Sequence, residues 1–527
     1  MTVSNLNFMP ASRAGLAPLP EVAIRLHPQD DVAIAKIALQ VGTILDLESG
    51  HHVPVRQFIP NGHKIALREI AEGEAIRRYG QIIGFATQSI SPGEHVHTHN
   101  LAVREFDREY VFGVEAHPVS FVPESERRTF MGYQRPSGRA GTRNYIAVIS
   151  SVNCSAHTIR EIAHHFTPER LADYPNVDGI IPIAHLSGCG NRIGGADQML
   201  LQRTLAGIAR HPNVGAYIIV GLGCETNQTA ELVDNFQLAS NGKPPLSLSI
   251  QECGGIRKTV QAGIEAIESL LPIVNRASRT PQPISELALA LQCGGSDSWS
   301  GVTANPVVGL VADEVVRQGG TVVLSETPEI YGAEHLLTRR AISAEVGRKL
   351  IDRVRWWEQH TARLGIEIDN NPSIGNKAGG LTTIYEKSLG AIAKGGSTSL
   401  MAVYDYAEPV TASGFTFMDT PGYDPVSVTG QVAGGCNLVL FTTGRGSVFG
   451  FKPAPSIKIV TNSETYHRMV DDMDVNAGQV LDGVPLQEVA AELLDLTIAV
   501  ASGQPSRSEA QGVGESEFNP WNLGGTL

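Results

Sequence analysis

Short apolar runs separated by turn residues fill residues 20–105, and this pattern is typical of a small all-β unit. Residues 32–35 and 64–67 form two such runs, and turns are expected at Asn61-Gly62 and Pro92-Gly93. Residues 106–130 hold scattered prolines and a charged stretch, so we expect a linker there.

From residue 131 onward, apolar strand-like runs alternate with segments of helical spacing. The runs cover residues 145–152, 177–184, 216–223, 246–251, 287–292, 321–325 and 438–442. Helices are expected over 159–165, 198–210, 256–271, 306–319 and 486–501. Continuous apolar strands between helices indicate parallel sheets that are covered on both faces. The sequence therefore predicts an α/β protein: a β-rich N-terminal module followed by two Rossmann-like lobes, over 131–275 and 280–527.

Polar and soft side chains gather directly after the predicted strands, where ligands bind in open α/β sheets. Five of the six cysteines stand there, and Cys436 instead precedes a strand; the five are Cys154, Cys189, Cys224, Cys253 and Cys293. His185, Glu225, Asp297 and Glu326 occupy similar positions. A single cysteine is more often a small buried apolar residue than a ligand. The joint pattern nevertheless predicts a shared site at one sheet edge.

Basic residues beside glycines form a second pattern. Arg143, Lys377 and Arg445 each lie in a glycine-containing stretch that suits the binding of a substrate carboxylate, although each stretch could equally be a solvated loop. The segment Gly-Leu-Gly-Cys at 221–224 is a weak dinucleotide signal, because no complete glycine fingerprint follows it.

Histidines mark the β-rich module. His63 precedes a predicted strand, and His95, His97 and His99 alternate at strand period, so the last three are expected to share one face. That face could bind a metal or could be an exposed edge.

Net charge, the length of apolar runs and the placement of cysteines limit which partners and which cell compartment we expect. The formal net charge is −13, which argues against nucleic acid or an anionic membrane as the main partner. No apolar run approaches the roughly 18 residues that span a bilayer. The first residues do not read as a secretion signal, and the dispersed cysteines do not read as a disulfide framework. We expect a cytoplasmic protein with free thiols.

Several segments resemble the altronate/galactarate dehydratase family. They are Cys-Gly-Gly-Ser-Asp at 293–297, Ser-Gly-Val-Thr-Ala-Asn-Pro at 300–306, Gly-Leu-Gly-Cys-Glu at 221–225, Asn-Pro-Ser-Ile-Gly-Asn-Lys at 371–377 and Phe-Thr-Thr-Gly-Arg-Gly at 441–446. Gly62-His63-Lys64 and residues 79–84 resemble the SAF module of that family, over the predicted 20–105 unit. Residues 93–100 and 328–334 look more like altronate than galactarate dehydratase.

The resemblance implies loss of water from an aldonate, giving a 2-keto-3-deoxy acid. The proton next to a carboxylate is very weakly acidic, so a cation and positioned donors must stabilise the charge that develops. The family implies a divalent metal, with Fe²⁺ leading and Mn²⁺ as an alternative; an iron–sulfur cluster stays open. We assign catalytic roles to His185, His63, Glu225 and Asp297. Substrate binding is assigned to Arg143, Lys377, Arg445 and Asn305, and metal binding to Cys224, Cys293, Cys189, Cys154 and Glu326.

Other functions compete with altronate dehydration. Galactarate, another sugar acid or a sulfonated hydroxy acid could be the substrate of a related lyase. An NAD-dependent oxidoreductase that uses residues 221–224 is a remote alternative, and a non-catalytic binding protein fits the polar strand ends less well. We expect a small anionic substrate and a homodimer.

Overall fold

Three small sheets build the N-terminal module of the computed structural model, which describes residues 14–47, 50–106, 108–136, 138–239 and 243–523. The sheets have the orders β1-β4-β5, β2-β3-β6-β9 and β10-β8-β7. The strands are β1 (Gly15–Pro18), β2 (Ala23–Ile24), β3 (Val32–Ala35), β4 (Thr43–Asp46), β5 (His52–Pro54), β6 (Lys64–Ala66), β7 (Ala75–Arg78), β8 (Gln81–Ala86), β9 (His95–Val96) and β10 (Leu101–Ala102), with the short helix α1 (Leu19–Val22). The predicted β-rich module is thus confirmed.

The segment that follows runs along the C-terminal part of the chain. Its backbone donates from Gly113 to Thr338 O at 3.1 Å and from Val122 to Arg317 O at 2.8 Å. It leads into a three-stranded antiparallel sheet of order β12-β11-β17, made of β11 (Thr129–Arg135), β12 (Gly138–Gly141) and β17 (Arg279–Pro283). This sheet joins the chain before and after the second region.

The second region is a four-stranded parallel sheet of order β14-β13-β15-β16. Its strands are β13 (Tyr145–Ser150), β14 (Gly179–Ile183), β15 (Val214–Gly221) and β16 (Ser247–Ser249). Its helices are α2 (Ala156–His164), α3 (Ala196–Ala209), α4 (Thr229–Asn235), α5 (Ile250–Cys253) and α6 (Ile256–Val274). All six residues of β13 are buried, as expected of a central strand that is covered on both faces.

The C-terminal region holds a seven-stranded parallel sheet of order β20-β21-β19-β18-β22-β23-β24. Its strands are β18 (Ala288–Cys293), β19 (Thr321–Leu324), β20 (Leu400–Tyr404), β21 (Gly414–Met418), β22 (Leu438–Thr443), β23 (Ser456–Val460) and β24 (Val475–Asn476). Its helices are α7 (Ala304–Arg317), α8 (Glu334–Arg339), α9 (Ala344–Leu364), α10 (Ile374–Ala378), α11 (Ile384–Ala391), α12 (Asp424–Ala433), α13 (Ser463–Arg468), α14 (Leu486–Ala501) and α15 (Arg507–Ala510).

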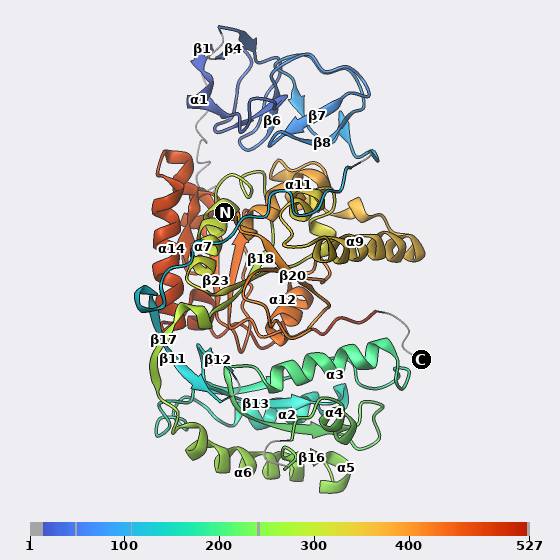
Figure 1. Ribbon diagram of the computed structural model, residues 1–527, viewed down its shortest axis with the longest axis vertical. Coiled ribbons are helices and arrows are strands. Elements are labelled where there is room, and N and C mark those ends of the chain that lie inside the picture. The colour runs from blue at the N-terminus through green and yellow to red at the C-terminus, as the bar shows by residue number, and fades with distance from the viewer. Residues whose placement is uncertain (1–13, 48–49, 107, 137, 240–242, 524–527) are drawn as a thin grey trace, which may run out of the picture.

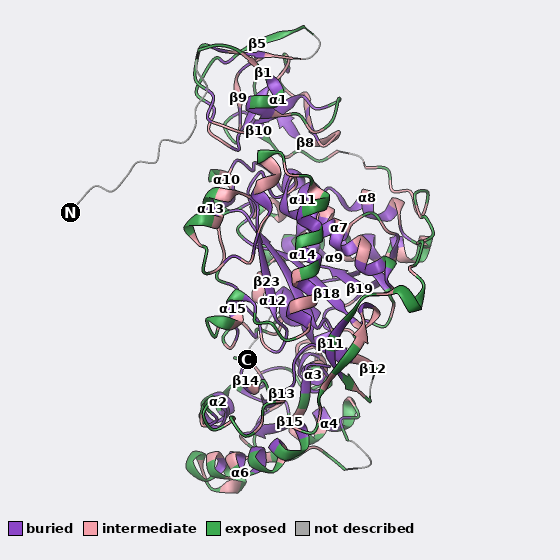
Figure 2. Cartoon of the chain, turned by 90° about the vertical axis from the view of Figure 1, so that its left-hand side faces the viewer, coloured by how far each residue is buried: buried purple, intermediate pink, exposed green. Residues whose placement is uncertain are grey.

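Side chains of β18, the central strand of the seven-stranded sheet, alternate between two hydrophobic cores. Leu289 and Leu291 face the cluster that contains α7 and α14, whereas Ala290 faces the cluster that contains α12 and part of the second region. Figure 2 shows the strands of this sheet as the most continuously buried part of the chain. The mixed α/β class with parallel sheets is confirmed, and β20, β21, β23 and β24 were not predicted.

The amino and carboxyl ends of the strands in the seven-stranded sheet face different parts of the chain. At its amino edge, just before β22, Asn437 O accepts from Thr142 Oγ1 of the second region at 2.8 Å, and Cys436 O accepts from His211 Nε2 at 2.9 Å. At its carboxyl edge, just after β18, Ser298 O accepts from Arg78 Nη2 of the N-terminal module at 2.6 Å. Figure 1 shows the same order, with the N-terminal module and the second region at opposite ends of the molecule.

This arrangement corrects the expectation of one shared site. The predicted strand ends belong to two sheets, so their carboxyl edges are two separate places. None of the helices in the described ranges is both long enough and apolar enough to cross a membrane.

Candidate functional site

A thiol and two carboxylates meet at the carboxyl edge of the seven-stranded sheet. Cys293 is the last residue of β18, and Glu326 and Glu329 follow β19. Cys293 Sγ lies 3.7 Å from Glu326 Oε2 and 3.6 Å from Glu329 Oε2. Glu326 adopts a φ of 68°, a left-handed conformation that a non-glycine residue adopts only where its surroundings enforce it. The turn after β19 thus aims both carboxylates at the thiol.

Two buried lysines face this trio. Lys387 Nζ on α11 lies 2.6 Å from Glu329 Oε1, and Lys394 Nζ lies 3.7 Å from Glu326 Oε2. Burial lowers the pKa of Lys387, but the negative groups around it, Glu329 first among them, together outweigh burial, so the pKa is raised overall. Burial and then the charge of Glu329 raise the pKa of Glu326 well above its ordinary value. The same two causes raise the pKa of Asp424, at the start of α12, to about 7.

The trio suits a divalent metal ion. Among the described residues, Cys293, Glu326 and Glu329 are the group whose ligand atoms all lie within 4.8 Å of one another. Burial raises the pKa of the Cys293 thiol to about 12, so without a cation the thiol keeps its proton. The raised pKa values of Glu326 and Asp424 favour their protonated forms in the same way. A divalent cation that displaced these protons and the thiol proton would leave three carboxylates and one thiolate facing two ammonium groups and the cation, which is a neutral cluster. One thiolate with two carboxylates is a fitting set for Fe²⁺ or Mn²⁺.

A small cavity with both polar and apolar lining residues lies beside the trio, between the C-terminal region and the N-terminal module. Its lining residues are Tyr79, Cys293, Ser296, Asp297, Ser300, Gly301, Asn305, Leu381, Glu386, Lys387, Gly390 and Ala391. Cys293, Asp297 and Asn305, which the sequence analysis assigned to three different roles, therefore share one cavity. Asn305 is held by Thr442 Oγ1, which donates to its Oδ1 at 2.7 Å, and by its own donation to Gly390 O at 2.8 Å.

Asp297 is a heavily hydrogen-bonded carboxylate of the cavity. It accepts from Thr461 Oγ1 at 2.9 Å and from the Trp299 amide at 3.0 Å. Burial raises its pKa, and these hydrogen bonds act against that shift. A Cβ built on Gly444 would lie 2.2 Å from Asp297 Cγ, and only glycine therefore fits beside the carboxylate.

Residues 376–380 form a turn, which we call the 376–380 turn, that connects the cavity to its rim. Ser373 caps α10 by accepting from the Asn376 amide, and Asn376 Nδ2 donates to Ser296 O at 2.7 Å, next to Asp297. A Cβ on Gly379 would lie 3.3 Å from Arg445 Cδ, so the Arg445 side chain runs beside this turn. Lys377 is half-buried in the turn and Arg445 is exposed. Two of the predicted substrate-binding cations thus stand together at the rim.

Histidines of the N-terminal module lie against the same turn. His97 Nε2 donates to Lys377 O at 2.9 Å, and His63 Nε2 donates to Ala378 O at 3.3 Å. His63 Nδ1 lies 3.0 Å from His95 Nε2, and the His95 ring centroid lies 5.4 Å from that of His99. His95, His97 and His99 gather as expected, and His63 joins them. Because β9 ends at Val96, a turn and not a strand brings His97 and His99 to His95.

His63 and His95 are neutral at pH 7. Burial, followed by the charge of His97, lowers the pKa of His63 to about 4, and burial, followed by the charge of His63, lowers that of His95 to about 3. Because His63 Nε2–H donates to a carbonyl, its Nδ1 must accept the N–H of His95 Nε2. A neutral pair of this kind can take up one proton.

The module is fixed in place by a buried ion cluster. Glu386 on α11 accepts from Lys64 Nζ at 2.9 Å and from Arg78 Nη1 at 2.6 Å. The charges of Lys64 and Arg78 outweigh burial and lower the pKa of Glu386 to about 2. A Cβ on Gly380, whose φ is 93°, would lie 2.2 Å from Gly62 O, so the two backbones meet where only glycine fits.

The other predicted residues lie elsewhere. Cys154, Cys189 and Cys224 are exposed at the carboxyl edge of the second sheet. His185 is buried there and both its ring nitrogens are used, since Nε2 donates to Ser150 O at 2.9 Å and Nδ1 accepts from the Ser187 amide at 3.1 Å. Burial lowers its pKa to about 4. Glu225 accepts from Ser151 Oγ at 2.7 Å. These five residues do not line the cavity at the carboxyl edge of the seven-stranded sheet.

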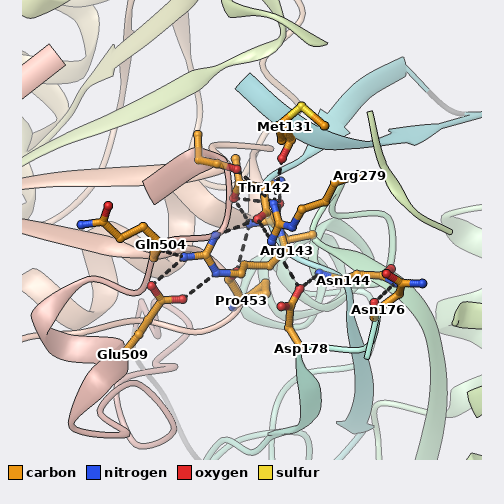
Figure 3. A network of polar contacts seen from close by, with 12 residues as sticks. Met131, Thr142, Arg143, Asn144, Asn176, Asp178, Arg279, Pro453, Gln504 and Glu509 are labelled. Atoms are coloured by element: carbon orange, nitrogen blue, oxygen red, sulfur yellow. Dashed lines mark hydrogen bonds and ion pairs between the residues drawn. The ribbon is translucent and has the colours of Figure 1, made fainter. Parts of the chain in front are cut away.

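Arg143 joins the second region to the C-terminal tail (Figure 3). Its Nη2 lies 2.7 Å from Glu509 Oε2, and Nη1 donates to Thr142 O at 2.7 Å and to Val500 O at 2.8 Å. The side chain is buried, and its guanidinium is fully occupied by these partners. It is therefore placed to fix the two regions together, away from the cavity.

Glu329, Lys387 and Lys394 were missed by the assignment of site residues. Glu329 lies only three positions after Glu326 and follows the same strand, so the strand-end rule is the signal that could have found it. The two lysines carry a clearer signal, because each interrupts an apolar helical stretch over 384–395, and α11 is buried along its whole length. A lysine in such a stretch is rarely buried unless it is paired.

Comparisons with known proteins cover nearly the whole chain. A family model described as altronate/galactarate dehydratase SAF domain matches residues 21–104. One described as D-galactarate dehydratase/altronate hydrolase, second domain, matches residues 132–275, and one described as D-galactarate/altronate dehydratase, C-terminal, matches residues 284–526.

Three relatives illustrate the range of similarity. An altronate dehydratase from Bacillus subtilis (strain 168) is 36% identical over 91% of this chain and 95% of its own length. A galactarate dehydratase (L-threo-forming) from Escherichia coli (strain K12) is 36% identical over 91% and 93%. A (2R)-sulfolactate sulfo-lyase subunit beta from Chromohalobacter salexigens is 34% identical over 75% and 97%.

Proposed function

Because the chain belongs to the altronate/galactarate dehydratase family, we propose that it removes water from D-altronate to give a 2-keto-3-deoxy-aldonate. The chain is a hydro-lyase of the altronate dehydratase type. The observation that carries the substrate assignment is its similarity to an altronate dehydratase along almost the full length of both proteins. The cavity at the carboxyl edge of the seven-stranded sheet is the place we assign to this reaction.

The metal is assigned to Cys293, Glu326 and Glu329. When bound, a divalent cation supplies positive charge beside the substrate carboxylate, which makes the neighbouring proton easier to remove. We favour Fe²⁺ over Mn²⁺ because one ligand is a thiolate. Lys387 and Lys394 hold the two carboxylates toward the thiol.

Proton removal is assigned to the paired imidazoles of His63 and His95. Their pKa values of about 4 and about 3 keep both rings neutral at pH 7, and Nδ1 of His95 is the unprotonated nitrogen of the pair to which we assign the C2 proton. Lys387, which lines the cavity as an ammonium group, is the donor beside the departing C3 hydroxyl. The enol left after water departs becomes the 2-keto-3-deoxy acid when C3 gains a proton.

Substrate binding is assigned to the rim and floor of the cavity. Arg445 and Lys377 are the cations at the rim, and an arginine fork matches a carboxylate in a bidentate manner. Asp297 on the floor offers carboxylate oxygens to the sugar hydroxyls, and Asn305 lines the same floor with its amide held by Thr442 and Gly390. His185, Glu225 and Arg143 are left out of this assignment, because their polar atoms are occupied outside the cavity.

Galactarate is the second candidate substrate. The galactarate dehydratase relative is as identical to this chain as the altronate dehydratase is. A second carboxylate at the far end of the substrate would need a second cation in the cavity. An NAD-dependent oxidation stays a remote alternative, since the glycine fingerprint is incomplete.

The proposal also covers the location of the protein, the class of its two parallel-sheet regions and its oligomeric state. Six free thiols, three of them exposed, suit a cytoplasmic location, where thiols stay reduced. The two parallel-sheet regions are assigned as Rossmann-like, because their helices connect parallel strands. The active form is proposed to be a homodimer.

The experiment is a substrate panel. Purified protein loaded with Fe²⁺ is incubated with D-altronate, galactarate and (2R)-sulfolactate, and the 2-keto acid product is measured. We expect the highest kcat/KM with altronate. A higher kcat/KM with galactarate would show that galactarate, and not altronate, is the preferred substrate. Nicotinamide-dependent turnover without loss of water would contradict the proposed dehydration.

A further inference from the structure

Three exposed cysteines lie at the carboxyl edge of the second sheet, one on each of three loops. Cys154 follows β13, Cys189 follows β14 and Cys224 follows β15. These strands are neighbours in the order β14-β13-β15, with β13 in the middle. Neighbouring strands lie about 4.8 Å apart, so the loops that leave them start within about 10 Å of one another. The sheet order reverses between β13 and β15, which is where open α/β sheets bind ligands.

Hydrogen bonds tie the three loops together beside the cysteines. The amide of Asn153 donates to Ser187 O at 2.9 Å, and the amide of Asn227 donates to Gly188 O at 3.1 Å. Asn227 Nδ2 also donates to Ser151 O at 2.8 Å. The loop after β14 is thus linked to both of the others, one or two residues from its own cysteine.

His185 and Glu225 form the buried base of this edge. His185 donates to Ser150 O at the end of β13, which joins the first two loops. Glu225 accepts from Ser151 Oγ at 2.7 Å and from the Gly223 amide at 2.6 Å, which fixes the turn that carries Cys224. Both residues position the thiol-bearing loops, and this explains buried polar side chains that the dehydratase cavity does not use.

The surroundings of the thiols suit a soft, anionic group. Leu186 and Ile193 lie on either side of Cys189 in the sequence and are 93% and 72% exposed. Their apolar side chains are therefore available to contact a ligand bound at the thiols. Gly188 and Gly190, on either side of Cys189, have positive φ values, whereas the amides of Gly194 and Gly223 already donate to Gln198 and Glu225. Glycine turns of this kind turn backbone N–H groups toward a bound anion.

The thiols are too far apart for one metal ion. A zinc ion with sulfur ligands at about 2.3 Å needs its sulfurs within about 4 Å of one another. In the part of the chain that the structure describes, a group of three ligand atoms within 4.8 Å occurs at Cys293 and not at these cysteines. A cluster of several iron ions can bridge wider gaps between thiolates.

We propose that Cys154, Cys189 and Cys224 bind a [4Fe–4S] cluster, with one iron left without a protein thiolate. Each thiol loses its proton when it binds iron. The cluster is separate from the metal assigned to Cys293 and stands independently of the dehydratase assignment. The class of cofactor follows from the number of thiolates, their spacing and the absence of a closer ligand group at this edge of the described structure.

Anaerobic reconstitution of the full chain tests this proposal. The protein is incubated with sulfide and equal amounts of ferrous and ferric ions, which together supply the oxidation state of the resting cluster, and is then desalted. We expect about four acid-labile sulfide ions and about five iron ions per chain, four of them in the cluster and one at the Cys293 site, with broad visible absorption. Iron bound without sulfide, or no sulfide above that of a thiol-blocked sample, would overturn the proposal.

Matched cysteine variants locate the site. Cys154→Ser, Cys189→Ser and Cys224→Ser should each lose most of the sulfide and the visible absorption. Cys253→Ser, on the same edge but one strand further out, and Cys293→Ser, in the dehydratase cavity, should keep both. Thermal unfolding checks that each variant is folded. Equal sulfide in the first three variants and in wild type would contradict the assignment.

Discussion

Lys64 of the N-terminal module and Glu386 of α11 form an ion pair in which neither side chain is exposed to solvent. Lys64 Nζ lies 3.0 and 2.9 Å from the two carboxylate oxygens of Glu386, and it also donates to Gly380 O at 2.6 Å. A buried charge is tolerated only with a partner, so this pair fixes where the module sits. The histidines that face the 376–380 turn are placed by the same contact.

Loss of Lys64 should therefore weaken the attachment of the N-terminal module to the C-terminal region. Lys64→Met leaves Glu386 with Arg78 as its single cationic partner, and we expect the free energy of unfolding to fall by about 3 kcal/mol. The rate of dehydration should fall with it, because His63 and His97 lose their fixed position. Denaturant unfolding and kcat measure the two effects.

The control for Lys64 is Lys349→Met. Lys349 forms an exposed ion pair with Glu408 at 3.8 Å, and exposed pairs contribute about 0.5 kcal/mol or less. Equal stability losses in the two variants would show that burial of the Lys64 pair does not hold the module.

Arg445 should act on substrate affinity. Arg445→Ala removes a rim cation, and we expect KM for the sugar acid to rise about 10- to 100-fold, as for the loss of charged hydrogen bonds. The measurement is steady-state kinetics at saturating metal. Arg363→Ala, an exposed arginine on α9, should leave KM unchanged, and an unchanged KM in Arg445→Ala would remove that side chain from the site.

Arg143 should behave in the opposite way. Arg143→Met leaves Glu509 without its buried partner at 2.7 Å, so the free energy of unfolding should drop by about 3 kcal/mol. KM should stay at the wild-type value, because the guanidinium does not reach the cavity. A raised KM with unchanged stability would return Arg143 to the substrate-binding set.

His211 predicts how stability depends on pH. Burial lowers its pKa from 6.5 to about 4, so the unfolded chain takes up a proton that the folded chain does not. The share of stability that depends on neutral His211 is fully present above pH 6.5. It is lost as the pH falls toward 4, by about 3 kcal/mol in total.

The check is His211→Gln, which keeps a donor for Cys436 O. Unfolding measured between pH 7 and 4 should fall less steeply in this variant than in wild type. The exposed His467→Gln should follow wild type. Parallel curves for His211→Gln and wild type would contradict the assignment.

Much of the fold could be predicted because its strands are continuous apolar runs. The pattern located β13, β14, β15, β18, β19 and β22. It missed β20, β21, β23 and β24. The glycine and threonine of β21 and the serine and lysine of β23 interrupt their apolar runs, and β24 has only two residues, whereas β20 is a short apolar run that the prediction passed over. It also could not tell that the strands form two sheets, because pairing partners are set by long-range packing.

The candidate site was predicted in part for the same reason. Cys293, Glu326 and Asp297 were found from their places after strands, since that rule depends only on local order. The roles of Lys387 and Lys394 depend on the folding of α11 over the sheet edge. The occupied nitrogens of His185 and the partners of Arg143 likewise come from contacts between segments far apart in the chain.

The most direct test of the account is Mn²⁺ binding and turnover in Glu329→Gln. Mn²⁺ forms no iron–sulfur cluster, so it reports the dehydratase site alone, and Glu492→Gln on α14 is the control. We predict that Glu329→Gln loses tight Mn²⁺ binding and that altronate dehydration drops by about 1,000-fold or more, while Glu492→Gln behaves as wild type. Wild-type Mn²⁺ affinity and wild-type turnover in Glu329→Gln would contradict the assignment of the metal and the reaction to this trio.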